Sequence, residues 1–497
     1  MTLKNVKSIT KTILAAIVIV IIIVAGVGIY YYYSSTIKPA PTTTLSGSIT
    51  VAVEPGYNDA AIQQIAKNFE AAYPGTTINL ADVGFSANPS AYVTAYGAGQ
   101  DVYDVAYFST AGQVGGFYQY LLPLQGYIQN TSYFQGSWNF SDIIPSTYAA
   151  YTINGNLYGI PMQSDAMLMF YIPSYFTNAT NQQEFQAEYG YPLPNPGTTT
   201  YTLQELVDVA NFFTHNHGSQ FGVEFNADTD DGDLFETFGQ IAVGIRENGS
   251  SVWGPISTTY GVPYTSNGQL LMNTSAFVTA LSDYAQLTKD TEAPFTGSFG
   301  AAVNYFMVPG TSPILFSYSY PMFFLNSTLG SNWAIAPTEI GGYAMLGGEG
   351  FGIYNGTHNL NLALAFVAYA TSPQQSVYYM TKDGLPPFRY SDFNLMVSDL
   401  NISPSIASVY LANLKTAVQV YANEPYESSV DSAFASVLPY VASGQITPAA
   451  GANLIETAGI NAGVTPYTGT GAGVLTSQIS GPQGGTSFTS LYDESSG

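Results

Sequence analysis

The stretch Ala95–Leu124, AYGAGQDVYDVAYFSTAGQVGGFYQYLLPL, decides the fold of this chain. It reads as a helix end, an acidic turn around Asp101, an apolar strand at Val105–Phe108 and a second helix marked by glycines. A short polar break, Ser109 and Thr110, follows the strand. In an open α/β sheet, ligands bind just beyond the carboxyl end of such a strand. We therefore predict that Ser109 and Thr110 belong to a ligand-binding loop.

The residues before this stretch alternate between strand and helix patterns. Ile49–Val53 and Thr77–Leu80 read as short strands. Between them, apolar residues from Ile62 to Phe69 recur at the three- and four-residue spacing of one helix face. Ala91–Gly97 reads as a second helix. The β-α-β-α-β order favours a parallel sheet, so we predict an α/β fold.

The composition excludes several classes of function. The chain has 497 residues, enough for two or more domains, and a formal net charge of -23 with only 10 Lys and Arg. Nucleic-acid binding is not expected, because it needs clustered basic side chains. With no cysteine and three histidines, disulfides, thiol catalysis and a Cys- or His-rich metal centre are not expected either. Only 9% of residues are charged. This indicates adaptation to an acidic medium, with compositional drift as the alternative.

The N-terminus predicts a membrane tether. Three lysines precede the apolar run Ile13–Ile29, and tyrosines follow it. This pattern predicts a transmembrane anchor over residues 1–33, with the bulk of the protein outside the cell. A cleaved signal peptide is the alternative. The run resembles archaeal pilin-like signal anchors, which implies an archaeal source. Residues 34–48 read as a Pro/Thr/Ser linker, and residues 463–497 as a flexible Gly/Ser/Thr-rich tail.

Eight segments between Ile49 and Ile460 carry a resemblance to a known family. In chain order they are NFEAAYPGTTINL, AYGAGQDVYDVAYF, GFYQYLLPL, NGNLYGIPMQSDAMLMFYIPSYF, TYTLQELVDVANFFT, GTSPILFSYSYPMFF, WAIAPTEIGGYAMLGGEGFGIY and LNLALAFVAYATSPQQSVYY. Together they resemble the family 1 extracellular solute-binding proteins, the maltose-binding-protein-like receptors of ABC sugar importers. The resemblance implies a binding role, with no catalysis and no cofactor in this chain. It implies a sugar ligand and membrane permease subunits as partners.

The resemblance also implies a two-lobed periplasmic-binding-protein-like fold of type II, with a hinge between the lobes and the ligand in the cleft. Crossings between the lobes are expected near Met162–Ala166, near Gly347–Gly350 and before the helices that follow Ser403. The expected first lobe comprises residues 49–163 and 351–400, and the second comprises residues 164–350 and 401–462.

Sugars are bound by aromatic faces and by carboxylates and amides that pair with hydroxyl groups. Side chains of these kinds occupy the expected loop ends and crossings of both lobes. The candidate ligand-binding residues are Glu54, Tyr57, Phe108, Ser109, Thr110, Asp165, Tyr318, Tyr320, Glu349 and Tyr426. The chain has only three tryptophans, which argues against a long, stacked oligosaccharide.

Other motifs leave alternatives open. The acidic run Asp228–Asp233 resembles a calcium loop at first sight, but its spacing fails, so a solvated loop is favoured. His215 and His217 are two residues apart, which is the wrong spacing for one helix face. Eight Asn-x-Ser/Thr sequences predict glycosylation. They lie at Asn130, Asn139, Asn178, Asn248, Asn273, Asn326, Asn355 and Asn401.

Three rival functions remain. Paired carboxylates could support glycoside hydrolysis, but nothing in the sequence marks an acid/base pair. A structural cell-surface glycoprotein would explain the anchor and the glycosylation sequences, but not the ordered segments. A binding protein for an oligopeptide or another polar solute is the third.

Overall fold

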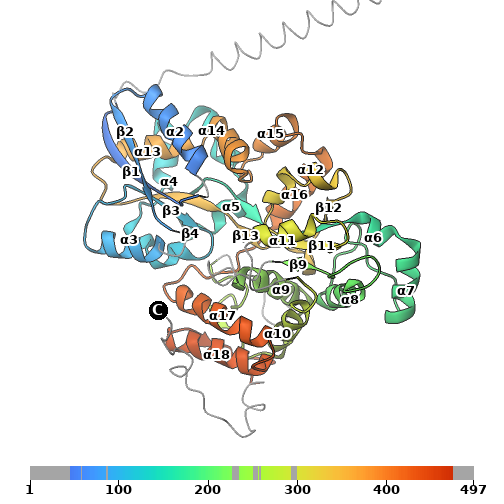
Figure 1. Cartoon of the computed structure of the whole chain (residues 1–497). Coiled ribbons are helices and arrows are strands. Elements are labelled where there is room, and N and C mark those ends of the chain that lie inside the picture. Colours follow the sequence, from blue (N-terminus) through green and yellow to red (C-terminus); the bar gives the residue numbers. More distant parts are fainter. Residues whose placement is uncertain are drawn as a thin grey trace, which may run out of the picture.

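The computed structural model describes residues 45–56, 59–84, 88–225, 234–249, 256, 259–292 and 299–473 (Figure 1). The predicted anchor, most of the linker, Tyr57, the acidic run Asp228–Asp233 and the end of the tail lie outside these residues. The described residues form a two-lobed α/β fold, with a larger sheet in each lobe. No helix within them is both long and apolar enough to span a membrane.

The first lobe is built on a sheet whose strands come from distant parts of the chain. Its order in the described residues is β2-β1-β3-β14-β6. The strands are β1 (Gly47–Val53), β2 (Thr76–Asp82), β3 (Val105–Ser109), β6 (Ile160–Pro161) and β14 (Glu349–Ile353). β1 is parallel to β2 and β3, as the sequence predicts, whereas β14 is antiparallel to β3 and β6.

Helices cover this sheet with their apolar faces. They include α2 (Asp59–Ala72), α3 (Asn88–Gly97), α4 (Gln125–Asn130), α13 (Leu360–Ala370) and α14 (Pro373–Tyr378). In α2, Ile62, Ile65 and Phe69 are fully buried, which confirms the predicted helix face. The ring of Phe69 meets that of Phe366 in α13 edge to face, with centroids 5.4 Å apart. Helix α2 is therefore held to the lobe by the same apolar residues whose spacing predicted the helix.

The second lobe is built on a smaller sheet with the order β12-β8-β11-β9 in the described residues. These strands are β8 (Leu168–Tyr171), β9 (Glu224–Phe225), β11 (Ile314–Ser317) and β12 (Ala334–Ile335). The helices between them are α6 (Pro173–Thr177), α7 (Ala179–Tyr189), α8 (Leu203–Phe213), α9 (Leu234–Gly249), α10 (Ser275–Leu287), α11 (Phe299–Phe306) and α12 (Asn326–Leu329). Helix α8 begins with a capping box, in which Thr202 and Glu205 satisfy each other's backbone N–H groups.

Two segments cross between the lobes side by side. The chain leaves the first sheet after β6, forms β7 (Asp165–Ala166) and enters the second sheet at β8. It returns through β13 (Leu346–Gly347) directly into β14. β7 and β13 are antiparallel, with Asp165 opposite Gly347. These passages lie where the sequence predicted the first two crossings, and we call residues 162–166 and 346–350 the crossing segments.

The C-terminal helices complete both lobes. They are α15 (Asp392–Ser398), α16 (Pro404–Thr416), α17 (Glu427–Ala442) and α18 (Pro448–Asn461). Figure 1 shows α17 and α18 together at the end of the second lobe, where they contact α9 and α10. Phe393 and Met396 of α15 share an apolar cluster with Leu168 and Phe170 of β8. Helix α15 thus packs with the second sheet, although its residues fall within the segment expected in the first lobe.

Candidate functional site

The polar loop after β3 lies against the second crossing segment. Ser109 ends the strand, and its N–H donates to Oε1 of Gln113 at 2.9 Å. Its hydroxyl accepts from the N–H of Ala111 at 3.2 Å. The N–H of Thr110 donates to the carbonyl of Gly348 at 2.8 Å. Both Ser109 and Thr110 are buried, so the predicted loop is part of the junction between the lobes.

Glu349 stands opposite Ser109 in the first sheet. The side-chain amide of Gln163 donates to Oε2 of Glu349, and the N–H of Met162 donates to the Glu349 carbonyl at 2.9 Å. Beside it, Gly348 has φ +114, and a Cβ there would lie 2.6 Å from the Cα of Ser164. Only glycine fits this close crossing. Gln163 was missed in the sequence, although its place two residues before Asp165 in a crossing segment could have suggested it.

Asp165 fixes the first crossing segment to the second lobe. Its Oδ1 accepts a hydrogen bond from the N–H of Ala166 at 2.7 Å. The same oxygen accepts from the N–H of Ser319 at 2.7 Å and from the Ser319 hydroxyl. Burial raises the pKa of Asp165 to about 6, against the lowering effect of these hydrogen bonds. Next to it, the ring of Tyr318 packs on Gly347, where an added Cβ would lie 2.5 Å from a ring carbon. Burial, with a smaller contribution from Asp165, raises the pKa of Tyr320.

The remaining candidates have partners elsewhere. Glu54 follows β1 and accepts from the hydroxyl of Tyr107 at 2.8 Å. Phe108 is fully buried in the apolar core of the first lobe, edge-on to Phe117 and Tyr151. Tyr426 precedes α17, with its ring centroid 6.0 Å from that of Tyr264. Tyr57 lies outside the described residues.

The structure therefore brings together a subset of the candidates at the crossing segments. This subset is Ser109, Thr110, Asp165, Tyr318, Tyr320 and Glu349, with Gln163 added. No lysine or arginine occurs anywhere between Lys67 and Arg246 or between Lys289 and Lys382 in the sequence. Hydroxyl, amide and carboxyl groups suit hydrogen bonding to a neutral, polar solute. They are poorly suited to an anionic one.

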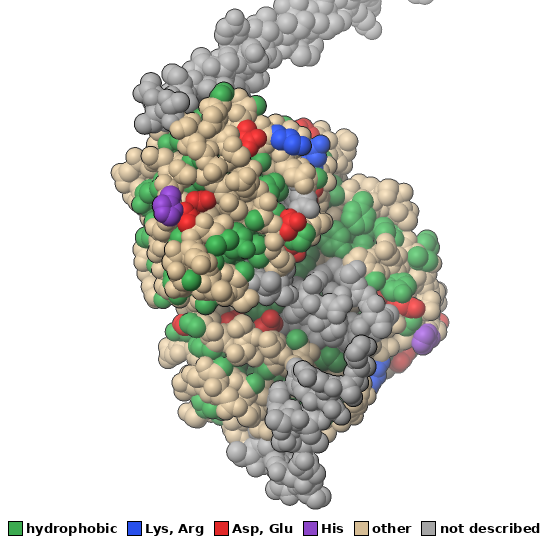
Figure 2. All heavy atoms as spheres, turned by 60° about the vertical axis from the view of Figure 1, so that its left-hand side comes forward, with side chains coloured by type: hydrophobic (Ala, Val, Ile, Leu, Met, Phe, Trp, Pro, Cys, Tyr) green, Lys and Arg blue, Asp and Glu red, His purple; other side chains and the backbone are tan. Residues whose placement is uncertain are grey.

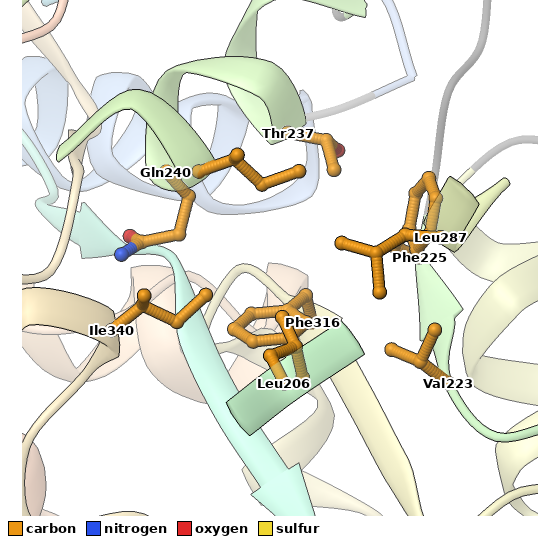
Figure 3. A pocket seen from close by; sticks show the side chains of 9 residues that line it. Leu206, Val223, Phe225, Thr237, Gln240, Leu287, Phe316 and Ile340 are labelled. Carbon is orange, nitrogen blue, oxygen red and sulfur yellow. The ribbon is translucent and has the colours of Figure 1, made fainter. Parts of the chain in front are cut away.

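Two other features do not form such a site. A small cavity in the second lobe (Figure 3) is lined by mostly apolar side chains, among them Leu206, Phe225 and Phe316. Two polar residues, Thr237 and Gln240, also line it, and the amide of Gln240 is already bonded to the backbone of Tyr343 and Met345. Among the described residues, no group of three or more His, Asp or Glu is arranged to hold a metal ion.

The surface agrees with the composition. On the face in Figure 2, hydrophobic side chains are interspersed among backbone and side chains that are neither hydrophobic nor charged, and acidic and basic side chains are scattered. The described residues on this face offer no extended basic patch of the kind that binds nucleic acid.

The sequence profile of the bacterial extracellular solute-binding proteins matches residues 64–392. The chain belongs to this family. The membership agrees with the expectation of a binding protein without catalytic activity. No curated protein sequence matches the chain.

Solved structures share the fold of this solute-binding protein. Maltose-bound MalE3 of T. maritima is 18% identical with a TM-score of 0.64, over 83% of this chain and 99% of that one. The GacH receptor of Streptomyces glaucescens, solved unliganded and with acarbose, is 20% identical with a TM-score of 0.63, over 84% and 98%. An ABC transporter solute-binding protein of Agrobacterium vitis with bound D-mannitol is 15% identical with a TM-score of 0.61, over 83% and 97%.

The contacts of Asp165 predict unequal effects of two substitutions. Asp165→Asn keeps the acceptor Oδ1, so the free energy of unfolding should change by less than about 1 kcal/mol. Asp165→Ala leaves the buried N–H and hydroxyl of Ser319 without this acceptor and should cost about 2–3 kcal/mol. Urea denaturation at pH 5 measures both, with the exposed Asp82→Ala as the control. Equal losses for the two Asp165 variants would contradict this role.

Buried carboxyl groups predict that stability falls as the pH rises. Burial raises the pKa of Glu339 and of Glu427 from 4.5 to about 8. The folded state then holds these protons more tightly than the unfolded state. Their contribution is complete below about pH 4.5 and is lost as the pH rises towards 8. Glu339→Gln should flatten part of this slope in urea denaturation from pH 4 to 8, and the exposed Glu188→Gln should not. Identical slopes for wild type and Glu339→Gln would refute the assignment.

Proposed function

We propose that this chain is the extracellular substrate-binding protein of an ABC importer, which captures a sugar between its lobes and delivers it to the permease. The observation that carries the proposal is the cluster at the crossing segments. There Ser109, Gln163, Asp165 and Glu349 bring hydroxyl, amide and carboxyl groups together. The sugars and the polyol named with structurally similar proteins, namely maltose, acarbose and D-mannitol, support this solute class.

We propose that binding works by hinge closure about the crossing segments. The loop after β3 supplies small polar contacts from the first lobe, and Asp165, Glu349 and the tyrosines Tyr318 and Tyr320 complete the site. Glu54, Tyr57, Phe108 and Tyr426 remain predicted contacts. A solute that touches both lobes stabilises the closed form over the open one. The lobe boundaries predicted from the sequence remain part of this proposal. Helix α15 spans them, because its residues fall in the segment expected in the first lobe but pack with the second sheet.

The proposal includes the setting of the protein. The N-terminal segment would tether the binding domain to the outside of the membrane, through the linker that sets its reach. Most of the predicted glycosylation asparagines that the structure describes have exposed side chains, which supports their modification. The exposed ones are Asn130, Asn139, Asn178, Asn326, Asn355 and Asn401.

A binding screen tests the proposal. Maltose, D-mannitol and D-tagatose, with a tripeptide as the alternative class, are titrated against the protein at pH 4 to 7 and followed by tyrosine and tryptophan fluorescence and by calorimetry. We expect saturable binding of at least one sugar or polyol with no product formed. Binding of the peptide alone, or of none of the four, would contradict the sugar assignment.

Glu349→Ala should weaken the binding of the best sugar about 10- to 100-fold, because it removes a carboxyl acceptor at the crossing. The exposed Glu188→Ala is the matched control and should bind like the wild type. Calorimetric titration gives both dissociation constants. Unchanged affinity for Glu349→Ala would remove this residue from the site.

A further inference from the structure

Two glycines after β3 lie directly against the backbone of the second lobe. They belong to the loop and the short 3-10 helix η2 (Gln113–Gly116). A Cβ on Gly115 would lie 2.3 Å from the backbone N of Glu424 and 2.4 Å from the carbonyl carbon of Asn423. A Cβ on Gly112 would lie 2.5 Å from the carbonyl oxygen of Ala422. These separations leave no room for a methyl group.

The two sides of this contact belong to different lobes. Val114, between the glycines, is buried in the apolar cluster of the first sheet. Tyr421 and Ala422 are buried in the cluster of the second lobe, together with Phe434 of α17. We call the approach of residues 112–115 to residues 422–424 the lobe contact. It lies outside the crossing segments, so the covalent connections between the lobes do not enforce it.

Hydrogen bonds fix the two backbone segments that form the lobe contact. The base of the loop is tied to the second crossing segment by the bond from Thr110 to Gly348. On the other side, the side-chain amide of Asn423 donates to the carbonyl of Ala150 at 2.8 Å, and both groups are buried. Ala150 is buried in the apolar cluster that contains Leu168 and Phe170 of β8, so this bond fixes residues 422–424 within the second lobe. The loop therefore connects the hinge to the facing lobe by rigid backbone contacts.

Gly116 provides an internal comparison. It is the next residue after Gly115, yet a Cβ on Gly116 would meet no atom within 4 Å. Gly115 and Gly116 both have backbone angles outside the left-handed region, unlike Gly112 with φ +71. Alanine is therefore compatible with the backbone at both positions, and only at Gly115 does it collide with the other lobe.

We propose that the lobe contact forms when the cleft closes, and that the absent side chain of Gly115 sets how far the lobes can close. Gly115 is then a positioning residue for solute retention. The inference rests on the proposed function, because it concerns closure over a bound solute. In an open form the backbone of Asn423 and Glu424 moves away, so Gly115→Ala penalises only the closed form. Fewer closed molecules mean a lower apparent affinity.

The distance between the lobes tests this directly. The chain has no cysteine, so Gln129→Cys and Thr457→Cys, at exposed positions on the first and second lobes, accept spin labels without background. The distance distribution is measured by pulsed electron paramagnetic resonance on the full chain, with and without maltose, D-mannitol or D-tagatose. Gly115→Ala and its control Gly116→Ala are compared in this labelled parent. Circular dichroism melting checks that each variant is folded.

We expect Gly115→Ala to shift the distribution to longer distances and to weaken binding of the active probe about tenfold or more. Gly116→Ala should match the parent. If Gly115→Ala does not fold, Asn423→Ala replaces it, because losing the bond to Ala150 frees the 422–424 backbone that Gly115 meets. It should broaden the distribution, and an unchanged distribution would then overturn the inference. Matching distributions and affinities for Gly115→Ala and Gly116→Ala would overturn the inference.

Failure of the proposed function would look different. If none of the three probes changes the parent's distribution, the sugar assignment fails. Gly115 is then judged on the ligand-free distributions alone. A longer mean distance for Gly115→Ala than for Gly116→Ala still supports the lobe contact, and equal distances overturn it.

Discussion

The structure depends on the close antiparallel pairing of the two crossing segments. Residues far apart in the sequence meet there, and the carbonyl groups of Gly348 and Glu349 accept hydrogen bonds from Thr110, Tyr151 and Met162. The pairing requires a residue without a Cβ at Gly348, because the backbone of Ser164 fills that space. The crossing makes one fold of the two α/β units. It joins the sheets, and it orients the loop after β3 towards the facing lobe.

A shortage of cations shapes the electrostatics of the same region. A buried carboxylate is usually stabilised by a nearby Lys or Arg, but this chain has only 10 such residues. Arg389, which is fully buried, donates to the carbonyls of Trp138 and Thr371. Asp165 and Glu339 instead rely on N–H and hydroxyl donors, and burial raises the pKa of each. Neutral carboxyl groups are compatible with a low-charge interior. Because burial raises their pKa, these groups contribute more to the stability of the folded state at acidic pH than at neutral pH.

Local sequence patterns predicted the parts of this architecture that are decided locally. The spacing of Ile62, Ile65 and Phe69 is a property of one helix, and the apolar run before Ser109 is a property of one strand, so both could be recognised. Phe108 was harder to place, because every residue of β3 is buried and alternation does not mark the face towards the solute. Gln163, the partner of Glu349, and the packing of α15 depend on long-range contacts that no local pattern encodes. The contacts with a solute stay predictions for the same reason.

The glycines after β3 show how one stretch can serve two purposes. In the sequence, Gly112, Gly115 and Gly116 read alike, as markers of a turn into a helix. In the fold, Gly112 adopts a left-handed backbone, Gly115 provides clearance for the other lobe, and Gly116 has open space around it. The distinction comes from the 422–424 backbone, about 300 residues further along the chain. A closing fold needs a surface that is small and rigid where the lobes meet. A loop fixed at its base to the crossing segment, through Thr110, supplies such a surface next to the polar groups that would hold the solute.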